Sequence, residues 1–311
     1  MLAIFLIVLP IFALIFAGWA IRRIGVLGPQ ASSELNRFVV YLALPALLFD
    51  IVAKAHWSEI WQPAFVAAFG IGSAVAFAAA IALRFFRPRH LADAAVDGLN
   101  AAYPNTGFIG FPLAAAVFGP ASLAPTLIAT IFTVCVLFAF ALILIEFSLQ
   151  AERRPHRMVA RVMMSLARNP LLVAPAAGAV FLAFGFSVPA PVDRFMTLLG
   201  DAASPCALVA LGLFLADKRE SAGGDAGTIS FLVTAKLVVQ PLVTWLVASR
   251  LLHMTPELTR MAVLIAALPT GTGSFMVAEF YRREAGITSR TILFSTIASI
   301  VTITLYLSIS S

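Results

Sequence analysis

Long apolar runs separated by short polar segments make up almost the whole chain. The first run, residues 2–21, has the roughly 20 residues that a helix needs to cross the hydrocarbon core of a bilayer. The pattern predicts an all-α polytopic membrane protein with ten transmembrane helices and no separate soluble domain. The predicted spans are 2–21, 35–53, 63–83, 92–118, 123–145, 170–187, 195–215, 229–248, 257–280 and 287–309.

Composition supports this class, and the placement of charge adds an orientation. The chain has 311 residues, of which 61% are hydrophobic and 12% charged, against about 25% charged in soluble domains. The formal net charge of +6 would suggest a nucleic-acid partner in a soluble protein, but here the basic residues gather in alternate connecting segments. We expect the protein to lie in the cell inner membrane. Because basic loops stay in the cytoplasm, both termini are expected to be external. The basic loops carry Arg22, Arg23, Arg84, Arg87, Arg89, Arg153, Arg154, Arg157, Arg161, Arg168, Lys218, Arg219, Arg282 and Arg283.

A basic link over residues 150–169 divides the ten predicted spans into five and five. A second half with the same odd number of spans must enter the membrane from the opposite side. The sequence therefore predicts an inverted-topology repeat, an architecture that recurs among transporters, with repeats at 1–149 and 170–311. "AAYPNTGF" from Ala101 and "AALPTGTG" from Ala266 occupy the fourth span of each half.

Proline, glycine and small polar residues interrupt both of these fourth spans, which are spans 4 and 9 of the chain. One interpretation is a pair of ordinary proline kinks, which membrane helices tolerate. The matching positions favour two broken, crossing helices whose positive N-terminal ends bind a carboxylate or phosphate. The candidate substrate-binding residues are Pro104, Asn105, Thr106, Gly107, Pro269, Thr270, Gly271, Thr272, Gly273 and Ser274.

Several of these stretches resemble the auxin efflux carrier family, the bacterial relatives of plant PIN-type transporters. The resemblance rests on "NAAYPNTGFIGFPLA" at 100–114, "LPALLF" at 44–49, "PCALVALGLFLA" at 205–216 and "ALPTGTGSFMVAEFY" at 267–281. It implies an elevator-type secondary transporter of small organic anions, auxin-like or mono- or dicarboxylate. Spans 1, 2, 6 and 7 would form the scaffold of a homodimer, and spans 3–5 and 8–10 the transport domain. The long cytoplasmic loop of many plant members is absent, so auxin specificity is not implied.

Ionisable residues within predicted spans are candidates for a functional role. Asp201 is a candidate for coupling, or it reaches the outer interface or pairs with a neighbour. Lys236 is a second candidate, or its side chain snorkels to the cytoplasm.

Two other functions compete with an organic-anion carrier. A sodium-coupled bile-acid-type symporter shares the crossed-helix plan, but sodium sites need carboxylates, and none lies close in sequence to the two interruptions. An intramembrane enzyme is disfavoured because the four histidines fall in loops or at span ends. Cys135 and Cys206 lie in apolar runs, so we predict no metal site, no cofactor and no disulfide. The expected partners are the anion, the lipid bilayer and a second copy of the chain.

Overall fold

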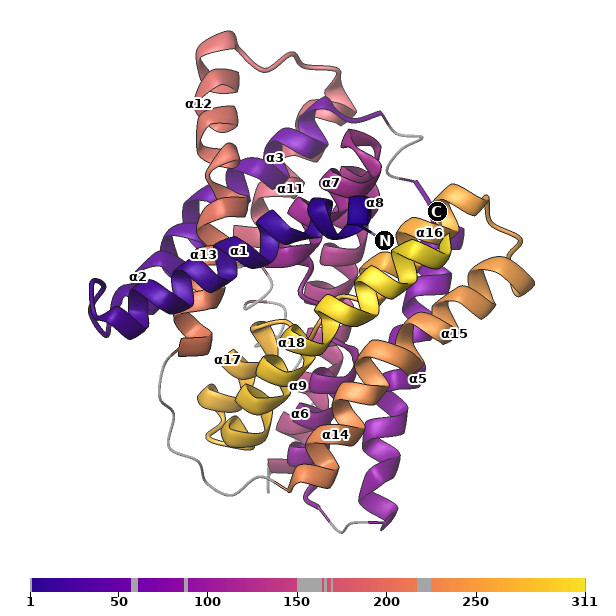
Figure 1. The fold of residues 1–311 in the computed structure, drawn as a ribbon. Coiled ribbons are helices and arrows are strands. Elements are labelled where there is room, and N and C mark those ends of the chain that lie inside the picture. The colour runs from indigo at the N-terminus through magenta and orange to yellow at the C-terminus, as the bar shows by residue number, and fades with distance from the viewer. Residues whose placement is uncertain are drawn as a thin grey trace.

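The structure is a computed structural model that describes residues 2–56, 61–86, 89–149, 164, 167–168, 170–216 and 225–310. Within these residues the regular structure is helical, with one isolated β-bridge and no strand (Figure 1). An all-α membrane protein is therefore confirmed, whereas the arrangement of ten spans as two inverted repeats stays a prediction. In this part of the chain six helices are long and apolar enough to cross a membrane: Ala31–Lys54, Pro63–Leu83, Pro120–Leu149, Ala190–Ala216, Ala226–Leu251 and Ala285–Ile309.

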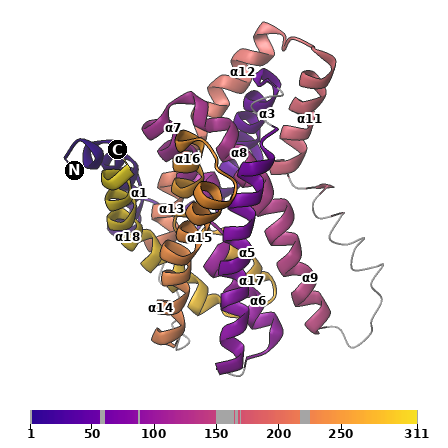
Figure 2. The same cartoon turned by 90° about the vertical axis from the view of Figure 1, so that its right-hand side faces the viewer.

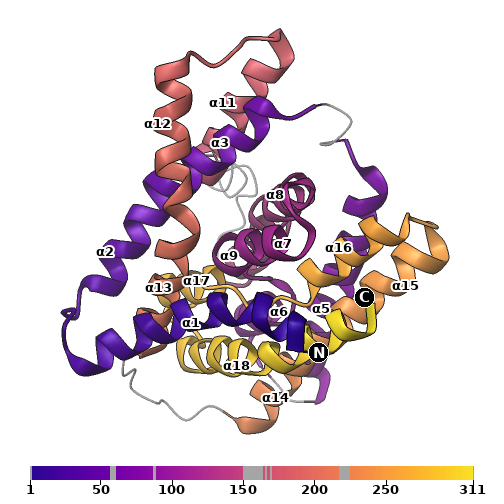
Figure 3. The ribbon, with the colours of Figure 1, turned by 45° about the horizontal axis from the view of Figure 1, so that its top comes forward.

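One group of helices packs mainly on itself and contacts the rest of the molecule along one side. Within it α1 runs along α13, and α3 lies against both α11 and α12 (Figure 3). The members of this group are α1 (Leu2–Ile24), α2 (Ala31–Phe38), η1 (Val39–Ala43), α3 (Leu44–Lys54), α11 (Pro170–Phe184), α12 (Ala190–Asp201) and α13 (Ala203–Ala216).

Two glycines explain how closely α1 and α13 approach. A Cβ atom added at Gly18 would overlap the carbonyl group of Val209, and one added at Gly212 would overlap the carbonyl oxygen of Ile15. The two backbones therefore touch directly, as they do at small-residue contacts between membrane helices.

The second group contains the remaining helices, with α5, α6 and α9 running side by side, α15 and α16 beside α5, and α14 against α6 (Figure 2). Its first members are α5 (Pro63–Phe86), α6 (Leu91–Ala102), η2 (Thr106–Gly110), α7 (Phe111–Phe118), η3 (Pro120–Ser122), α8 (Leu123–Ile131), η4 (Phe132–Leu137) and α9 (Phe138–Leu149). The others are α14 (Ala226–Thr234), η5 (Ala235–Val239), α15 (Gln240–Leu246), η6 (Val247–Leu251), α16 (Pro256–Ala266), α17 (Gly273–Phe280) and α18 (Ala285–Ser310).

Ion pairs tie the start of α6 to the segment that precedes α18. Arg89 bonds Asp97 at 2.9 Å and lies 3.5 Å from Glu284, while Arg283 bonds Asp93 at 2.8 Å. The Asp97 side chain is only 1% exposed, so its charge depends on Arg89. Burial raises the pKa of Glu284, with Asp93 also raising it and Arg89 acting in the opposite direction.

Candidate functional site

Helical structure is interrupted at two places that are far apart in sequence. In the first half α6 ends at Ala102 and helix resumes with η2 at Thr106. In the second half α16 ends at Ala266 and α17 begins at Gly273. Proline at both interruptions removes a backbone donor and disfavours a continuous helix.

The two interruptions lie against each other as a short antiparallel pair. The Asn105 N–H donates to the Pro269 carbonyl at 2.9 Å, and the Gly271 N–H donates to the Tyr103 carbonyl at 2.9 Å. These bonds flank a β-bridge between Pro104 and Thr270. Each interrupted segment therefore satisfies part of the other's backbone, which an interior without water requires.

Side chains behind this pair fix its position. The Thr270 hydroxyl donates to the Asn100 carbonyl at 2.8 Å, and the Thr270 N–H donates to the Ser295 hydroxyl at 3.1 Å. The Asn100 amide in turn donates to the Thr288 hydroxyl at 2.9 Å. Thr270 is fully buried in this network, so its bonds serve the framework of the site.

The helical segment formed by η5 and α15 supplies donors to the C-terminal ends of α6 and α16, the helices that precede the two interruptions. Lys236 Nζ donates to the Ala266 carbonyl at 2.7 Å, and Gln240 Nε2 donates to the Ala102 carbonyl at 3.2 Å. Gln240 Nε2 also lies 3.0 Å from the Ser73 hydroxyl. The negative ends of α6 and α16 are thus partly satisfied within the protein. Because Lys236 is 0% exposed and bonds Ala266, the alternative in which its side chain snorkels to the cytoplasm is wrong, whereas its role in coupling stays a prediction.

The positive ends of the following helices border a cavity of about 130 Å³ instead. Asn105 is the N-cap of η2, and its Oδ1 accepts from the Phe108 N–H at 3.3 Å. The Asn105 Nδ2 is buried and has no hydrogen-bond partner among the described residues. The backbone N–H groups of Gly107, Thr272 and Gly273 likewise make no hydrogen bond within the described ranges. All four residues line the cavity, which places four donors without a partner among the described residues close to its wall.

The ten candidate residues divide into two sets. Four of them build the antiparallel pair or the turn behind it and do not line the cavity: Pro269, Thr270, Gly271 and Ser274. The other six line it: Pro104, Asn105, Thr106, Gly107, Thr272 and Gly273.

The remaining predicted and lining residues complete the picture. Asp201 ends α12 as an exposed residue and does not line the cavity. Sequence reasoning missed three polar lining residues, Asn36, Tyr103 and Thr130. Asn36 and Thr130 lie far from the interruptions in sequence, whereas Tyr103 lies directly before Pro104 in the first interruption. None of the described residues lining the cavity is charged at neutral pH.

A second cavity of about 300 Å³ adjoins the first. The two share Asn36, Phe108, Thr272 and Met276 as lining residues. The second cavity extends to Pro29, in the connection between α1 and α2, and to Ser32 and Ser33, in the first turn of α2. That connection follows Arg22 and Arg23 and is predicted to be cytoplasmic.

Comparisons with known proteins match nearly the whole chain. A family model described as "Membrane transport protein" matches residues 3–307. The chain is 33% identical to the "Putative malonate transporter" of Rhizobium meliloti, covering 96% of this chain and 92% of the relative. It is 26% identical to the "Uncharacterized transporter YfdV" of Escherichia coli K12, covering 97% and 96%. It is 21% identical to "Auxin efflux carrier component 8" of Arabidopsis thaliana, covering 92% and 91%.

Proposed function

The chain belongs to the membrane transport protein family, and on that premise we propose that it is a secondary transporter of small organic anions. Its relatives confirm the resemblance to auxin efflux carriers, and family membership makes it a transporter rather than an enzyme. The substrate is proposed to bind in the 130 Å³ cavity where the two interruptions meet.

The single observation that carries this proposal is the set of donors at the cavity wall. Four donors have no partner among the described residues: Asn105 Nδ2 and the N–H groups of Gly107, Thr272 and Gly273. Unpaired buried donors are costly, and N–H groups at helix starts bind anions well. A carboxylate supplies acceptors for them without requiring a lysine or arginine.

Cavity size points to a small substrate. A volume of about 130 Å³ suits a short mono- or dicarboxylate better than an indole ring with an acid side chain. The name of the Rhizobium relative, at 33% identity, refers to malonate. Malonate is therefore the first compound to test.

The mechanism proposed is an elevator movement between the two helix groups. We assign the group of α1–α3 and α11–α13 to the predicted scaffold and call it the scaffold group. The other group is assigned to the predicted transport domain and is called the transport group. The cavity lies at their boundary, because Asn36, Val40 and Leu44 come from the scaffold group and the other lining residues from the transport group. Its continuation toward Ser32 and Ser33 supports an inward-facing state. A scaffold-mediated homodimer in the inner membrane, with external termini, completes the proposal.

Coupling is proposed to be independent of sodium. No carboxylate lines the cavity among the described residues, although sodium sites are built from carboxylate and carbonyl oxygens. Lys236 donates to the Ala266 carbonyl, which is the kind of oxygen that a coupling cation would use. That carbonyl is thus already occupied by the lysine side chain, and we assign no part in coupling to Asp201, which is exposed and does not line the cavity.

Binding of malonate and of malonamide to the purified protein tests this function. Malonamide has nearly the same shape but carries no charge and offers fewer acceptors to the four donors. We expect malonate, and not malonamide, to raise the thermal unfolding midpoint and to be taken up by proteoliposomes. Absence of binding and uptake for malonate and for other two- to five-carbon carboxylates would contradict the proposal.

A further inference from the structure

A further concave site lies on the outside of the transport group. It is a groove of about 750 Å³ formed by η5, α15, η6, α16 and α18, and it reaches the second interruption at Ala267. Exposed side chains border it, with Leu242 51%, Trp245 39% and Ile309 78% exposed. The groove therefore opens outward from the helix bundle, toward the surrounding lipid.

The groove has the length of one membrane leaflet. Leu237 and Ser249 both line it, and their separation along helical structure corresponds to about 18 Å at 1.5 Å per residue. Half of the hydrocarbon core is about 15 Å thick. By the predicted topology Ser249 lies near the external surface and Leu237 near the bilayer centre, so the groove spans the outer leaflet.

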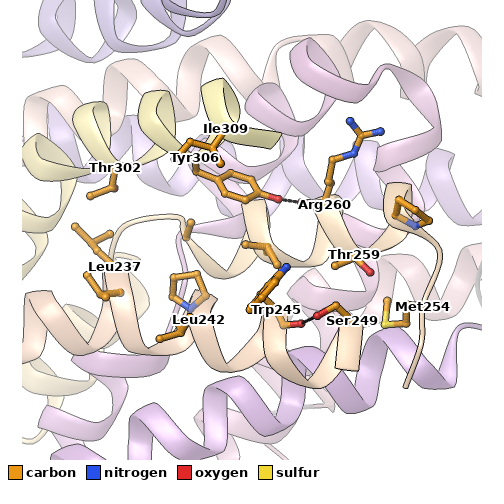
Figure 4. A pocket seen from close by; sticks show the side chains of 15 residues that line it. Leu237, Leu242, Trp245, Ser249, Met254, Thr259, Arg260, Thr302, Tyr306 and Ile309 are labelled. Carbon is orange, nitrogen blue, oxygen red and sulfur yellow. Dashed lines mark hydrogen bonds between the residues drawn. The ribbon is translucent and has the colours of Figure 1, made fainter. Parts of the chain in front are cut away.

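The arginine and most of the polar side chains lie toward one end of the groove (Figure 4). Ser249, Thr259 and Arg260 lie toward that end, and Leu237 lies at the other end beside Thr302. The Thr259 side chain is only 7% exposed, and its hydroxyl has no hydrogen-bond partner among the described residues. Tyr306 lies between the two ends and donates to the Arg260 carbonyl at 3.0 Å.

The polar end is also positively charged. Arg260 lines it, and the guanidinium carbon of Arg250 lies 5.9 Å from the centre of the Trp245 ring, which is another lining side chain. Among the described residues that line the groove, none is acidic. The site thus combines an apolar channel as deep as one leaflet with an arginine and an unpartnered hydroxyl at headgroup level.

We propose that this groove binds one anionic phospholipid of the outer leaflet. Its acyl chain lies along Leu237, Leu242 and Ile309, and its phosphate faces Arg260 and Thr259. Ala267, the residue after the Ala266 carbonyl that accepts from Lys236, also lines the groove, so the lipid contacts the C-terminal end of α16. The proposal is independent of substrate identity and of the elevator mechanism.

Trp245 provides a direct probe for this lipid. The chain has four tryptophans, and replacing Trp19, Trp57 and Trp61 by Phe leaves Trp245 alone. This variant is reconstituted in phosphatidylcholine vesicles that contain brominated-chain phosphatidylglycerol or, in a parallel set, brominated-chain phosphatidylcholine. We expect phosphatidylglycerol to quench Trp245 with a relative binding constant about fivefold higher, the effect of one basic residue near an anionic lipid.

Two substitutions separate the groove from general charge effects. Arg260→Gln is expected to abolish the preference, whereas Arg194→Gln is expected to retain it, because Arg194 is an exposed arginine of α12 outside the groove. Thr302→Phe fills the apolar end of the groove and should reduce quenching by both lipids. Equal quenching by the two lipids in the parent protein, or a preference that survives Arg260→Gln, would overturn the proposal. Weak quenching by both would do the same and indicate a protein partner over Trp245.

A second measurement leaves all four tryptophans in place. Native mass spectrometry of the unaltered protein, exchanged into detergent and supplied with phosphatidylglycerol, should detect one retained lipid per chain. The retained fraction should fall several-fold in Arg260→Gln and stay unchanged in Arg194→Gln. Equal retention in all three proteins would overturn the proposal even if the single-tryptophan variant failed to fold.

Discussion

Gly271 is the position where the pairing of the two interruptions can be tested with one methyl group. A Cβ atom added there would lie 2.8 Å from Tyr103 Cδ1 and 3.2 Å from the backbone Cα of Asn105. Carbon atoms prefer separations of about 3.5–4.0 Å, so the paired segments must move apart by several tenths of an ångström. This movement would lengthen the hydrogen bond from the Gly271 N–H to the Tyr103 carbonyl, which is 2.9 Å long.

Forcing a methyl group into a closely packed interior costs about 1–3 kcal/mol. We therefore expect Gly271→Ala to lower the unfolding free energy by that amount and to weaken malonate binding, because Asn105 is displaced with its backbone. Thermal unfolding in detergent and isothermal titration with malonate measure the two effects.

Gly107→Ala is the matched control for stability. Its added Cβ would meet only the Leu44 Cδ2 methyl, at 3.3 Å, which a side-chain rotation relieves, and alanine favours helix over glycine by about 1 kcal/mol. We expect its unfolding midpoint to stay at or above that of the unaltered protein. If Gly271→Ala kept both the original midpoint and the original affinity, the close pairing of the two segments would be refuted.

Two further predictions concern charged groups. Arg89→Gln leaves the buried Asp97 without its ion-pair partner and should lower the unfolding free energy by about 3 kcal/mol. Arg37→Gln removes a pair whose side chains are 69% and 64% exposed and should lower it by less than about 1 kcal/mol. Equal unfolding midpoints for the two variants would contradict this ranking. Replacing sodium by choline should leave malonate uptake within about twofold, since Lys236 already occupies the Ala266 carbonyl and no carboxylate lines the cavity among the described residues. Loss of uptake in choline would favour the sodium-coupled alternative.

Local sequence patterns predicted an all-α membrane protein and the positions of the two interruptions, but not the contacts between distant segments. Apolar runs of about 20 residues mark helices in lipid directly, and Pro104 and Pro269 mark the two interruptions. Asn105 is of a residue type favoured at helix N-caps, and the bond from the Phe108 N–H shows it in that role.

Contacts between distant segments were beyond local patterns. The position of Lys236 along its helix left two alternatives open, a coupling role and snorkelling to the cytoplasm, and only the helix face it occupies, which points to Ala266, excludes the second. Asp97 has the spacing of a helix-start acid with Asp93, yet a loop arginine, Arg89, makes it a buried ion-pair partner. Asn36 reaches the cavity only because the two helix groups are packed together, which no single segment encodes.

Asn105 combines two roles that one pair of substitutions can separate. Its Oδ1 caps η2, whereas its Nδ2 is the unpartnered donor at the cavity. Aspartate caps helices about as well as asparagine, but it has no amide donor and adds a negative charge. Alanine removes both roles and should cost about 1 kcal/mol of stability as well.

Malonate affinity of Asn105→Asp, measured by isothermal titration beside its unfolding midpoint, tests the central claim most directly. A charge-assisted hydrogen bond contributes about 1.5–3 kcal/mol, which corresponds to roughly a ten- to hundredfold change in Kd. We predict an unfolding midpoint close to that of the unaltered protein together with at least a tenfold loss of affinity. Unchanged affinity in a folded Asn105→Asp protein would contradict a binding site at the meeting point of the two interruptions.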